Sequence, residues 1–114
     1  MRKQMIENAA HEVATQVRTV EDCIESALAE ITELQGKMIR ARAAAGIGVA
    51  IGHPAFEQLV GAMHGLVSAR GGMANCHAAL VEAKRFVPGL RTVSFGEGDE
   101  CPPQKGHTDL RIVA

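Results

Sequence analysis

The first 45 residues carry a heptad pattern of small and aliphatic side chains, and this pattern limits what the chain can fold into. One row, the first heptad row, consists of Ala10, Val17, Ile24, Ile31, Met38 and Ala45. The second heptad row consists of Ile6, Val13, Val20, Ala27, Leu34 and Ala41. The rows alternate at spacings of three and four, which places both on one stripe of a long helix. Because such a stripe has to be buried against another helix, the pattern predicts helix association.

The composition limits which partners the chain can have. A chain of 114 residues suits one domain, and its hydrophobic residues (46%) include few aromatics (3%) and no Trp or Tyr. The core is therefore built from Ala, Val, Leu, Ile and Met, and it lacks the aromatic platforms on which single-stranded nucleic acids stack. A net charge of −1 provides no basic surface for a phosphate backbone. We expect no nucleic-acid partner.

The cysteines and the apolar middle of the chain bear on metal binding and on the compartment. Cys23, Cys76 and Cys101 form no Cys-x-x-Cys pair, so we expect reduced thiols in a cytoplasmic protein and no metal site. Residues 43–69 carry a single formal charge, at Glu57, which leaves a membrane-associated hairpin as an alternative. Pro54 and two histidines inside that stretch argue against a bilayer span.

Glycines divide the helical part of the chain into two arms. We expect a first helix over about 4–45, which Gly46, Gly48 and Gly52 end, because glycine costs about 1 kcal/mol in a helix interior. Pro54 suits the first position of a second helix over about 54–86. The connection 46–53 would then form an apolar hairpin tip carrying Ile47, Val49 and Ile51. Since the first arm is longer, we expect part of its stripe to extend beyond the second arm.

The second predicted helix has interface residues on two opposite sides. Its broad apolar stripe consists of Leu59, Val60, Met63, Leu66, Val67, Met73, Ala74, His77, Leu80 and Val81. The opposite side is small rather than charged and consists of Gly61, Gly65, Ser68, Gly72, Cys76 and Ala79. Small residues let another helix approach closely, whereas a solvated helix face normally carries charges. We therefore expect burial on both sides, one against the first helix and one against a neighbouring chain.

Residues 88–114 differ in character from the helical arms. Leu90 to Phe95 alternate like a short strand, and a Gly-, Pro- and acid-containing stretch follows. We expect a tail that is partly extended or disordered.

One histidine offers an alternative function. The stretch Ala62 to Ala69 resembles the helical histidine site of phosphotransfer domains, with His64 as the phosphoacceptor and Gly61, Gly65 and Ser68 leaving room for a partner. It departs from that family's pattern because no Lys follows His64 by three or four residues. Otherwise we find no catalytic motif and no cofactor motif, so an enzyme is not expected.

These features together predict an all-α fold, a long antiparallel helical hairpin over residues 1–87 that dimerises into a four-helix bundle. The predicted function is that of a non-catalytic adaptor or regulatory module. It would act as a homo-oligomer, with a dimer favoured, and would present its tip and C-terminal tail to an unidentified protein partner.

Overall fold

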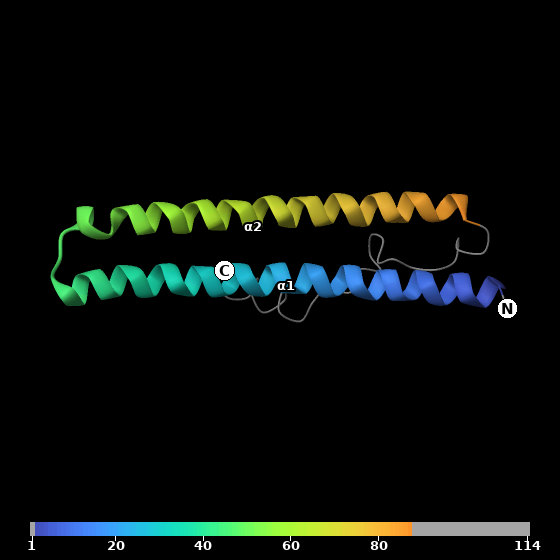
Figure 1. Cartoon of the computed structure of the whole chain (residues 1–114), viewed down its shortest axis with the longest axis horizontal. Coiled ribbons are helices and arrows are strands. Elements are labelled where there is room, and N and C mark those ends of the chain that lie inside the picture. The colour runs from blue at the N-terminus through green and yellow to red at the C-terminus, as the bar shows by residue number, and fades with distance from the viewer. Residues whose placement is uncertain (1, 88–114) are drawn as a thin grey trace, which may run out of the picture. The chain divides into compact units, whose positions relative to one another are not determined.

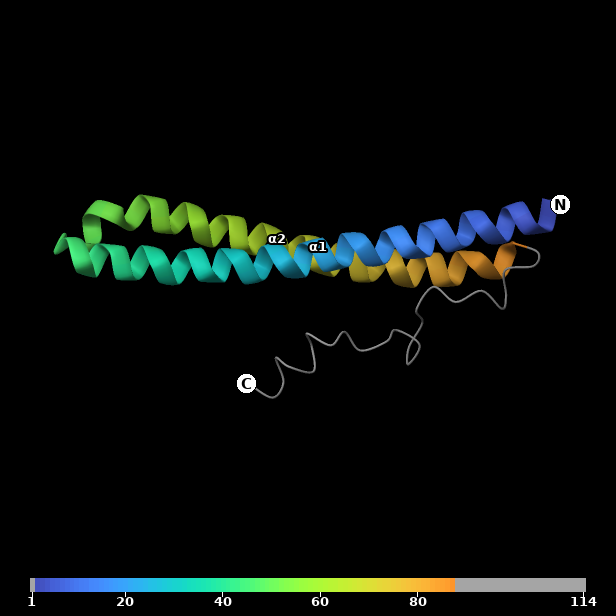
Figure 2. The same ribbon diagram turned by 90° about the horizontal axis from the view of Figure 1, so that it is seen from below.

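The computed structural model describes residues 2–87, and within them the chain forms a hairpin of two long helices with no strand. Helix α1 spans Arg2–Ala45, helix α2 spans Val49–Ala83, and the short 3-10 helix η1 spans Lys84–Phe86. Figures 1 and 2 show α1 and α2 lying side by side in opposite directions, joined by a short connection. The all-α hairpin predicted from the sequence is confirmed, and the predicted tail over 88–114 lies outside the described residues.

The hairpin consists of two compact units. The loop unit is Val17–Asn75, and the terminal unit contains residues 2–16 and 76–87 of the described chain. Each unit takes one segment from α1 and one from α2, so each is a two-helix layer with its own contacts.

The connection between the helices is shorter than predicted. Helix α1 ends as expected, at Gly46, whose φ of 68° is a left-handed conformation that glycine adopts without strain. Its N–H donates to the carbonyl of Ala43 (3.2 Å), which closes the helix end.

The predicted connection 46–53 and the predicted helix start at 54 are wrong. Helix α2 begins at Val49, with an Ile51 N–H that donates to the Gly48 carbonyl (3.2 Å), and both Gly52 and Pro54 lie inside the helix. Pro54 lies five residues after Val49, beyond the first turn, so it removes the N–H that would donate to the Ala50 carbonyl, and α2 continues through it at that cost. Val49 and Ile51, predicted as tip loop residues, therefore stand on the first turn of α2, while Ile47 remains in the connection.

The contact between the helices buries very little completely. Among residues 2–87, Ala10 in the terminal unit (6% exposed) and Leu59 in the loop unit (8%) are the buried hydrophobic residues. Ile6, Ala14, Val81 and Val87 pack around Ala10. Because Ile6 and Ala10 share this cluster with Val81 and Val87, the predicted overhang of the α1 stripe is wrong as far back as Ile6. Val81 in the last turn of α2 and Val87 after η1 cover this part of α1.

Candidate interaction surfaces

The two heptad rows of α1 have different environments. Ala10 is buried, and Val17, Ile24, Ile31 and Met38 of the first row are half-buried. The residues four positions after them are half-buried as well; they are Ala14, Glu21, Leu28, Gln35 and Arg42. In the second row, Ile6, Val20 and Ala27 are half-buried, whereas Val13 (43% exposed), Leu34 (48%) and Ala41 are exposed. Helix α2 therefore contacts one flank of the predicted stripe, and the second heptad row lies at the edge of that contact.

This placement corrects the expectation that both rows face the second helix. The stripe is wider than one helix can cover, because a partner helix contacts rows on either side of a single line. In the hairpin, α2 packs on the first row and the positions four residues later, so the second row is covered only in part, and Val13, Leu34 and Ala41 remain exposed.

Helix α2 shows the same division. The predicted interface residues Leu59, Met63, Leu66, Met73, His77 and Leu80 are buried or half-buried at alternating spacings of three and four or seven. Val60 (47% exposed), Val67 (54%) and Ala74, also placed in the apolar stripe, are exposed. The contact is therefore a narrow heptad seam rather than a broad stripe.

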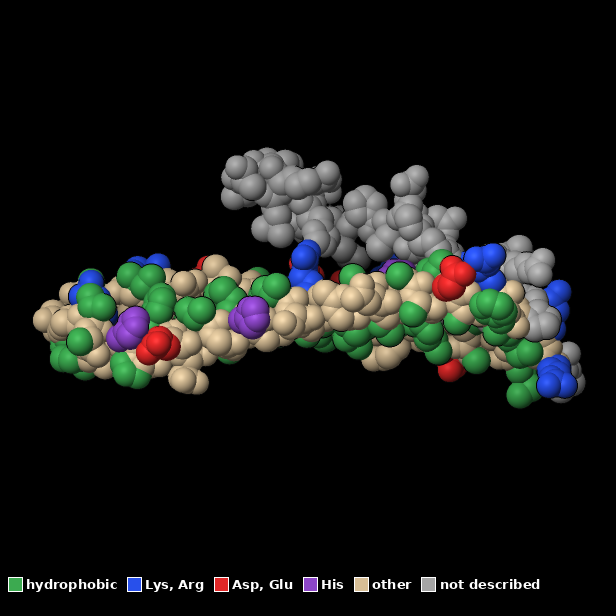
Figure 3. All heavy atoms as spheres, turned by 90° about the horizontal axis from the view of Figure 1, so that it is seen from above, with side chains coloured by type: hydrophobic (Ala, Val, Ile, Leu, Met, Phe, Trp, Pro, Cys, Tyr) green, Lys and Arg blue, Asp and Glu red, His purple; other side chains and the backbone are tan. Residues whose placement is uncertain are grey.

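The residues predicted for the small side of α2 are all exposed, namely Gly61, Gly65, Ser68, Gly72, Cys76 and Ala79. Figure 3, which looks onto the α2 side of the hairpin, shows mainly uncharged surface with few Lys, Arg, Asp or Glu side chains.

An ion pair shows the register of the helices in the loop unit. The Nε–H of Arg70 donates to Oε1 of Glu25, so a side chain of α2 reaches across to α1. Glu25 and Arg70 therefore lie at about the same level of the hairpin.

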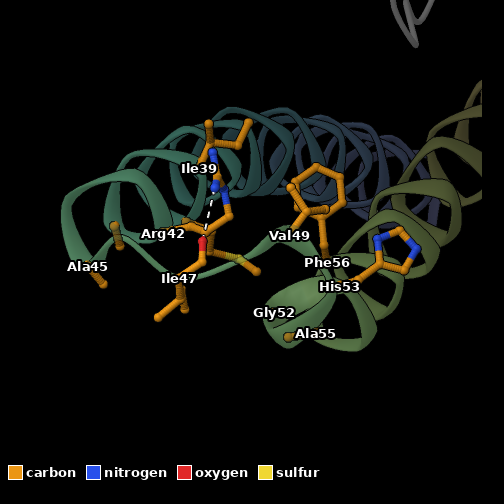
Figure 4. Close-up of a pocket in the computed structure, with 11 residues that line it drawn as sticks. Ile39, Arg42, Ala45, Ile47, Val49, Gly52, His53, Ala55 and Phe56 are labelled. Atoms are coloured by element: carbon orange, nitrogen blue, oxygen red, sulfur yellow. Dashed lines mark hydrogen bonds between the residues drawn. The ribbon is translucent and has the colours of Figure 1, made fainter.

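An apolar groove of about 580 Å³ lies at the tip of the loop unit (Figure 4). The residues that line it are Met38, Ile39, Ala41, Arg42, Ala45, Ile47, Val49, Gly52, His53, Ala55 and Phe56. Val49 and Ile51 are among the most exposed large hydrophobic residues of the described chain, at 63% and 70%. A surface of this kind is unusual in the absence of a partner.

Arg42 is the cation of the groove. Its Nη1 donates to the Ile47 carbonyl (3.1 Å), which ties the connection to the end of α1. A guanidinium has five N–H donors in a fixed plane, so this contact leaves capacity for an acceptor on a bound partner. On α2, His53 Nε2 lies 3.7 Å from Glu57 Oε1. The groove thus combines a mainly apolar lining with a charged hydrogen-bond donor, the Arg42 guanidinium.

A second, smaller hollow of about 310 Å³ lies in the terminal unit. It is lined by Ile6, Ala9, Ala10, Val13, Leu80, Ala83, Lys84 and Val87. Its lining shows that Val13 of the second heptad row and Ala83 of α2 lie near each other in this unit.

Other candidate sites show no assembled chemistry. His64 is exposed on α2, as a phosphoacceptor has to be. Cys23 and Cys76 are free thiols and exposed, and Cys101 lies outside the described residues. Over residues 2–87, no group of three or more metal-ligating side chains comes together. Neither long helix of this part of the chain is apolar over enough length to cross a membrane.

In comparisons with known proteins, no family model, no curated protein and no solved structure matches this chain. The functional argument therefore depends on the surfaces of the hairpin itself.

Proposed function

We propose that the chain is a non-catalytic helical interaction module that acts as a homo-oligomer, with a dimer favoured, and presents its tip to a protein partner. The observation that carries this proposal is the small amount of apolar surface that the hairpin buries. Ala10 and Leu59 are the buried hydrophobic residues of the described chain, while ten large hydrophobic side chains within it are exposed.

A two-helix layer with so little buried surface gains little from the hydrophobic effect, which is the main favourable term in folding. Most helix stability in proteins comes from packing of an apolar face rather than from helix propensity. Association with a second hairpin would bury the open rows and supply that packing, as in four-helix bundles.

Molecular mass in solution tests the self-association. Sedimentation equilibrium of the full chain should give about 24 kDa, twice the 12.1 kDa of one chain. A single species of 12.1 kDa at tens of micromolar protein would overturn this part of the proposal.

The tip groove is the surface that we propose for the protein partner. A segment with an apolar side chain for the groove and a carboxylate for Arg42 matches its chemistry, because Arg forms strong charge-assisted hydrogen bonds with carboxylates. The C-terminal tail, outside the described residues, would be the second element presented to a partner.

An anionic apolar dye such as anilinonaphthalene sulfonate probes the groove directly. We expect the dye to bind with a several-fold rise in fluorescence, and Val49→Ser or Arg42→Gln to remove most of that rise. Val60→Ser is the matched control, since Val60 is also exposed (47%) but does not line the groove. Equal dye fluorescence in all three variants would show that the groove is not a binding surface.

Phosphotransfer through His64 is a second candidate, which the exposure of His64 favours. Incubation with a small-molecule phosphoryl donor such as phosphoramidate should then give an acid-labile phosphate. That phosphate should be absent from His64→Gln and present in His53→Gln, another exposed histidine of α2. Failure of the wild-type chain to take up phosphate would remove this candidate.

A further inference from the structure

Ten consecutive residues at the turning end of the loop unit carry no polar side chain. This segment, residues 43–52, is called the apolar end; it contains the last three residues of α1, the connection and the start of α2, and consists of Ala, Gly, Ile and Val. Residues 43–51 are all exposed, and Ile51 is 70% exposed. A connection between helices normally carries polar residues, because it meets water. The composition of the apolar end therefore indicates contact with an apolar medium.

The charges around the apolar end are all positive. Residues 34–56 contain three cations, Lys37, Arg40 and Arg42, and no Asp or Glu. At 1.5 Å per residue, Arg42 and Arg40 lie about 5 and 8 Å before the last residue of α1. The next acid along α2, Glu57, lies about 12 Å from the start of that helix, which is more than the Debye length of about 8 Å. The medium that contacts the apolar end should therefore present negative charge beside an apolar phase.

The backbone of the connection is suited to a medium with little water. The Gly46 N–H donates to the Ala43 carbonyl (3.2 Å), and the Ile51 N–H donates to the Gly48 carbonyl (3.2 Å). The guanidinium of Arg42 donates to the carbonyl of Ile47, in the middle of the connection. Irregular backbone is costly to place in hydrocarbon unless its polar groups are paired. These three hydrogen bonds lower that cost.

The surface of an anionic lipid bilayer has the two properties that the apolar end requires. An interfacial apolar surface inserts about 5–10 Å into the boundary between headgroups and acyl chains, and Arg40 and Arg42 lie about that far behind the end of α1. With residues 43–52 inserted, both guanidiniums would be level with the lipid phosphates. Ten residues are too few to span a bilayer, which takes about 20 in a helix, so the insertion is shallow.

A protein interface is a poorer match for the apolar end itself. Interfaces between proteins are enriched in aromatic residues and carry about one hydrogen bond per 100–200 Å². Residues 43–52 contain no aromatic residue and no side chain that can hydrogen-bond. A lipid phase requires neither.

We propose that the loop unit inserts its apolar end into the surface of an anionic lipid bilayer, with Ile47, Val49 and Ile51 among the acyl chains and the three cations at the lipid phosphates. This inference goes beyond the protein partner proposed above. It also depends on residues outside the groove, because neither Ile51 nor Arg40 lines it. The membrane contact can therefore be changed while the groove stays intact.

Co-sedimentation of the full chain with lipid vesicles tests the membrane contact. Vesicles of neutral phosphatidylcholine are compared with vesicles of equal parts phosphatidylcholine and anionic phosphatidylglycerol. A Lys or Arg near an anionic surface strengthens binding about fivefold, so three cations should make the partition coefficient about 100-fold larger on the anionic vesicles. High salt should reduce this difference. No binding to the anionic vesicles, or equal binding to both kinds, would overturn the proposal.

The apolar contribution is tested outside the groove. Ile51→Ser should lower the partition coefficient on anionic vesicles about tenfold, because it removes most of an aliphatic side chain from the acyl chains. Val67→Ser is the matched control, since Val67 is exposed on the same helix (54%) but lies outside the apolar end, and it should leave binding unchanged. Circular dichroism establishes that both variants keep their helix content. Equal losses in the two variants would contradict insertion by the apolar end.

The contribution of charge is tested in the same way. Arg40→Gln should lower the partition coefficient on anionic vesicles about fivefold. Lys3→Gln removes an exposed cation of the terminal unit and should leave binding unchanged. A loss in Lys3→Gln as large as that in Arg40→Gln would mean that the chain binds lipid through its general charge rather than through the apolar end.

An environment-sensitive fluorophore measures the insertion directly. In a background with Cys23, Cys76 and Cys101 changed to Ala, the label is attached through Ala50→Cys or Ser68→Cys, both at exposed positions of α2. We expect the label at position 50 to brighten several-fold on anionic vesicles and to be quenched by lipids that carry a nitroxide on the acyl chain. The label at position 68 should do neither. An equal response at both positions would overturn the proposal.

The outcomes separate this inference from the proposed function. If the chain does not bind anionic vesicles, the inference is wrong, while the molecular mass and the dye fluorescence still test the proposed function. Ile51→Ser should weaken vesicle binding without changing the dye fluorescence of the groove. Loss of both would show that the groove, rather than the apolar end, carries the vesicle binding, and this too would overturn the inference.

Discussion

The two helices differ in the surface that each turns away from the other. Helix α1 carries Glu12, Arg18, Asp22, Glu33 and Arg40 outside its apolar rows, as a helix does when it faces water. Between Glu57 and Arg70, α2 carries no Asp, Glu, Lys or Arg, and its exposed positions are mainly Gly, Ala, Ser and Val. The difference teaches that the hairpin is asymmetric: α1 supplies a charged surface, and α2 supplies an uncharged surface of mainly small side chains.

The largest expected effect on stability comes from comparing a substitution on the side of α2 that contacts α1 with one on its exposed side. Leu59→Ala should lower the free energy of unfolding by about 2–4 kcal/mol, because it removes the most buried large side chain of the loop unit. Val60→Ala, at the adjacent and half-exposed position, should lower it by less than about 0.5 kcal/mol. Urea unfolding at one fixed protein concentration measures both. Similar losses would mean that both sides of α2 are equally covered.

The intermediate effect concerns Gly46, the left-handed glycine that follows the last residue of α1. Gly46→Ala should destabilise the chain by about 1 kcal/mol, because alanine is strained at a φ of 68°. Gly52→Ala, inside α2, should instead stabilise the chain by up to about 1 kcal/mol, because alanine favours a helix interior and its Cβ would meet no atom within 4 Å. Thermal unfolding of the two variants makes the comparison. An equal effect at both positions would argue against the left-handed helix end.

The smallest expected effect concerns the ion pair between Glu25 of α1 and Arg70 of α2. A double-mutant cycle with Glu25→Gln and Arg70→Met should give a coupling of about 0.2–0.5 kcal/mol, because the Arg70 side chain is 56% exposed and screened by solvent. High salt should reduce the coupling further. A coupling above about 2 kcal/mol in unfolding experiments would mean that the pair is buried in the assembled protein.

Most of the fold could be predicted from particular residues. The start of α2 was predicted wrongly, because local sequence signals conflict there. The heptad rows predicted a long first helix, and Gly46 predicted where it ends. Gly52 was taken as part of the connection and Pro54 as the first residue of the second helix, because glycine and proline both disfavour a helix interior. Instead, α2 begins at Val49 and continues through both residues.

For the interaction surfaces, the predicted small side of α2 is exposed in the hairpin, and its burial against a neighbouring chain stays a prediction; a regular row of small residues on that helix was not predicted. The sequence contained the signal, since Ala62, Gly65, Ala69 and Gly72 repeat at spacings of three and four. Alanine and glycine occur throughout α2, so the row becomes distinct only when the residues that contact α1 are known.

The sequence by itself determined that the chain forms two long helices, that they fold back at Gly46, and that both carry apolar rows at helical spacing. Only the tertiary structure decided how far each helix is rotated about its own axis. A heptad pattern with apolar residues on several neighbouring rows lets a partner settle on either flank, at nearly equal local cost. In the hairpin, Leu59 marks the flank on which the two helices pack, and this rotation leaves Leu34 of α1 and Gly65 and Gly72 of α2 exposed.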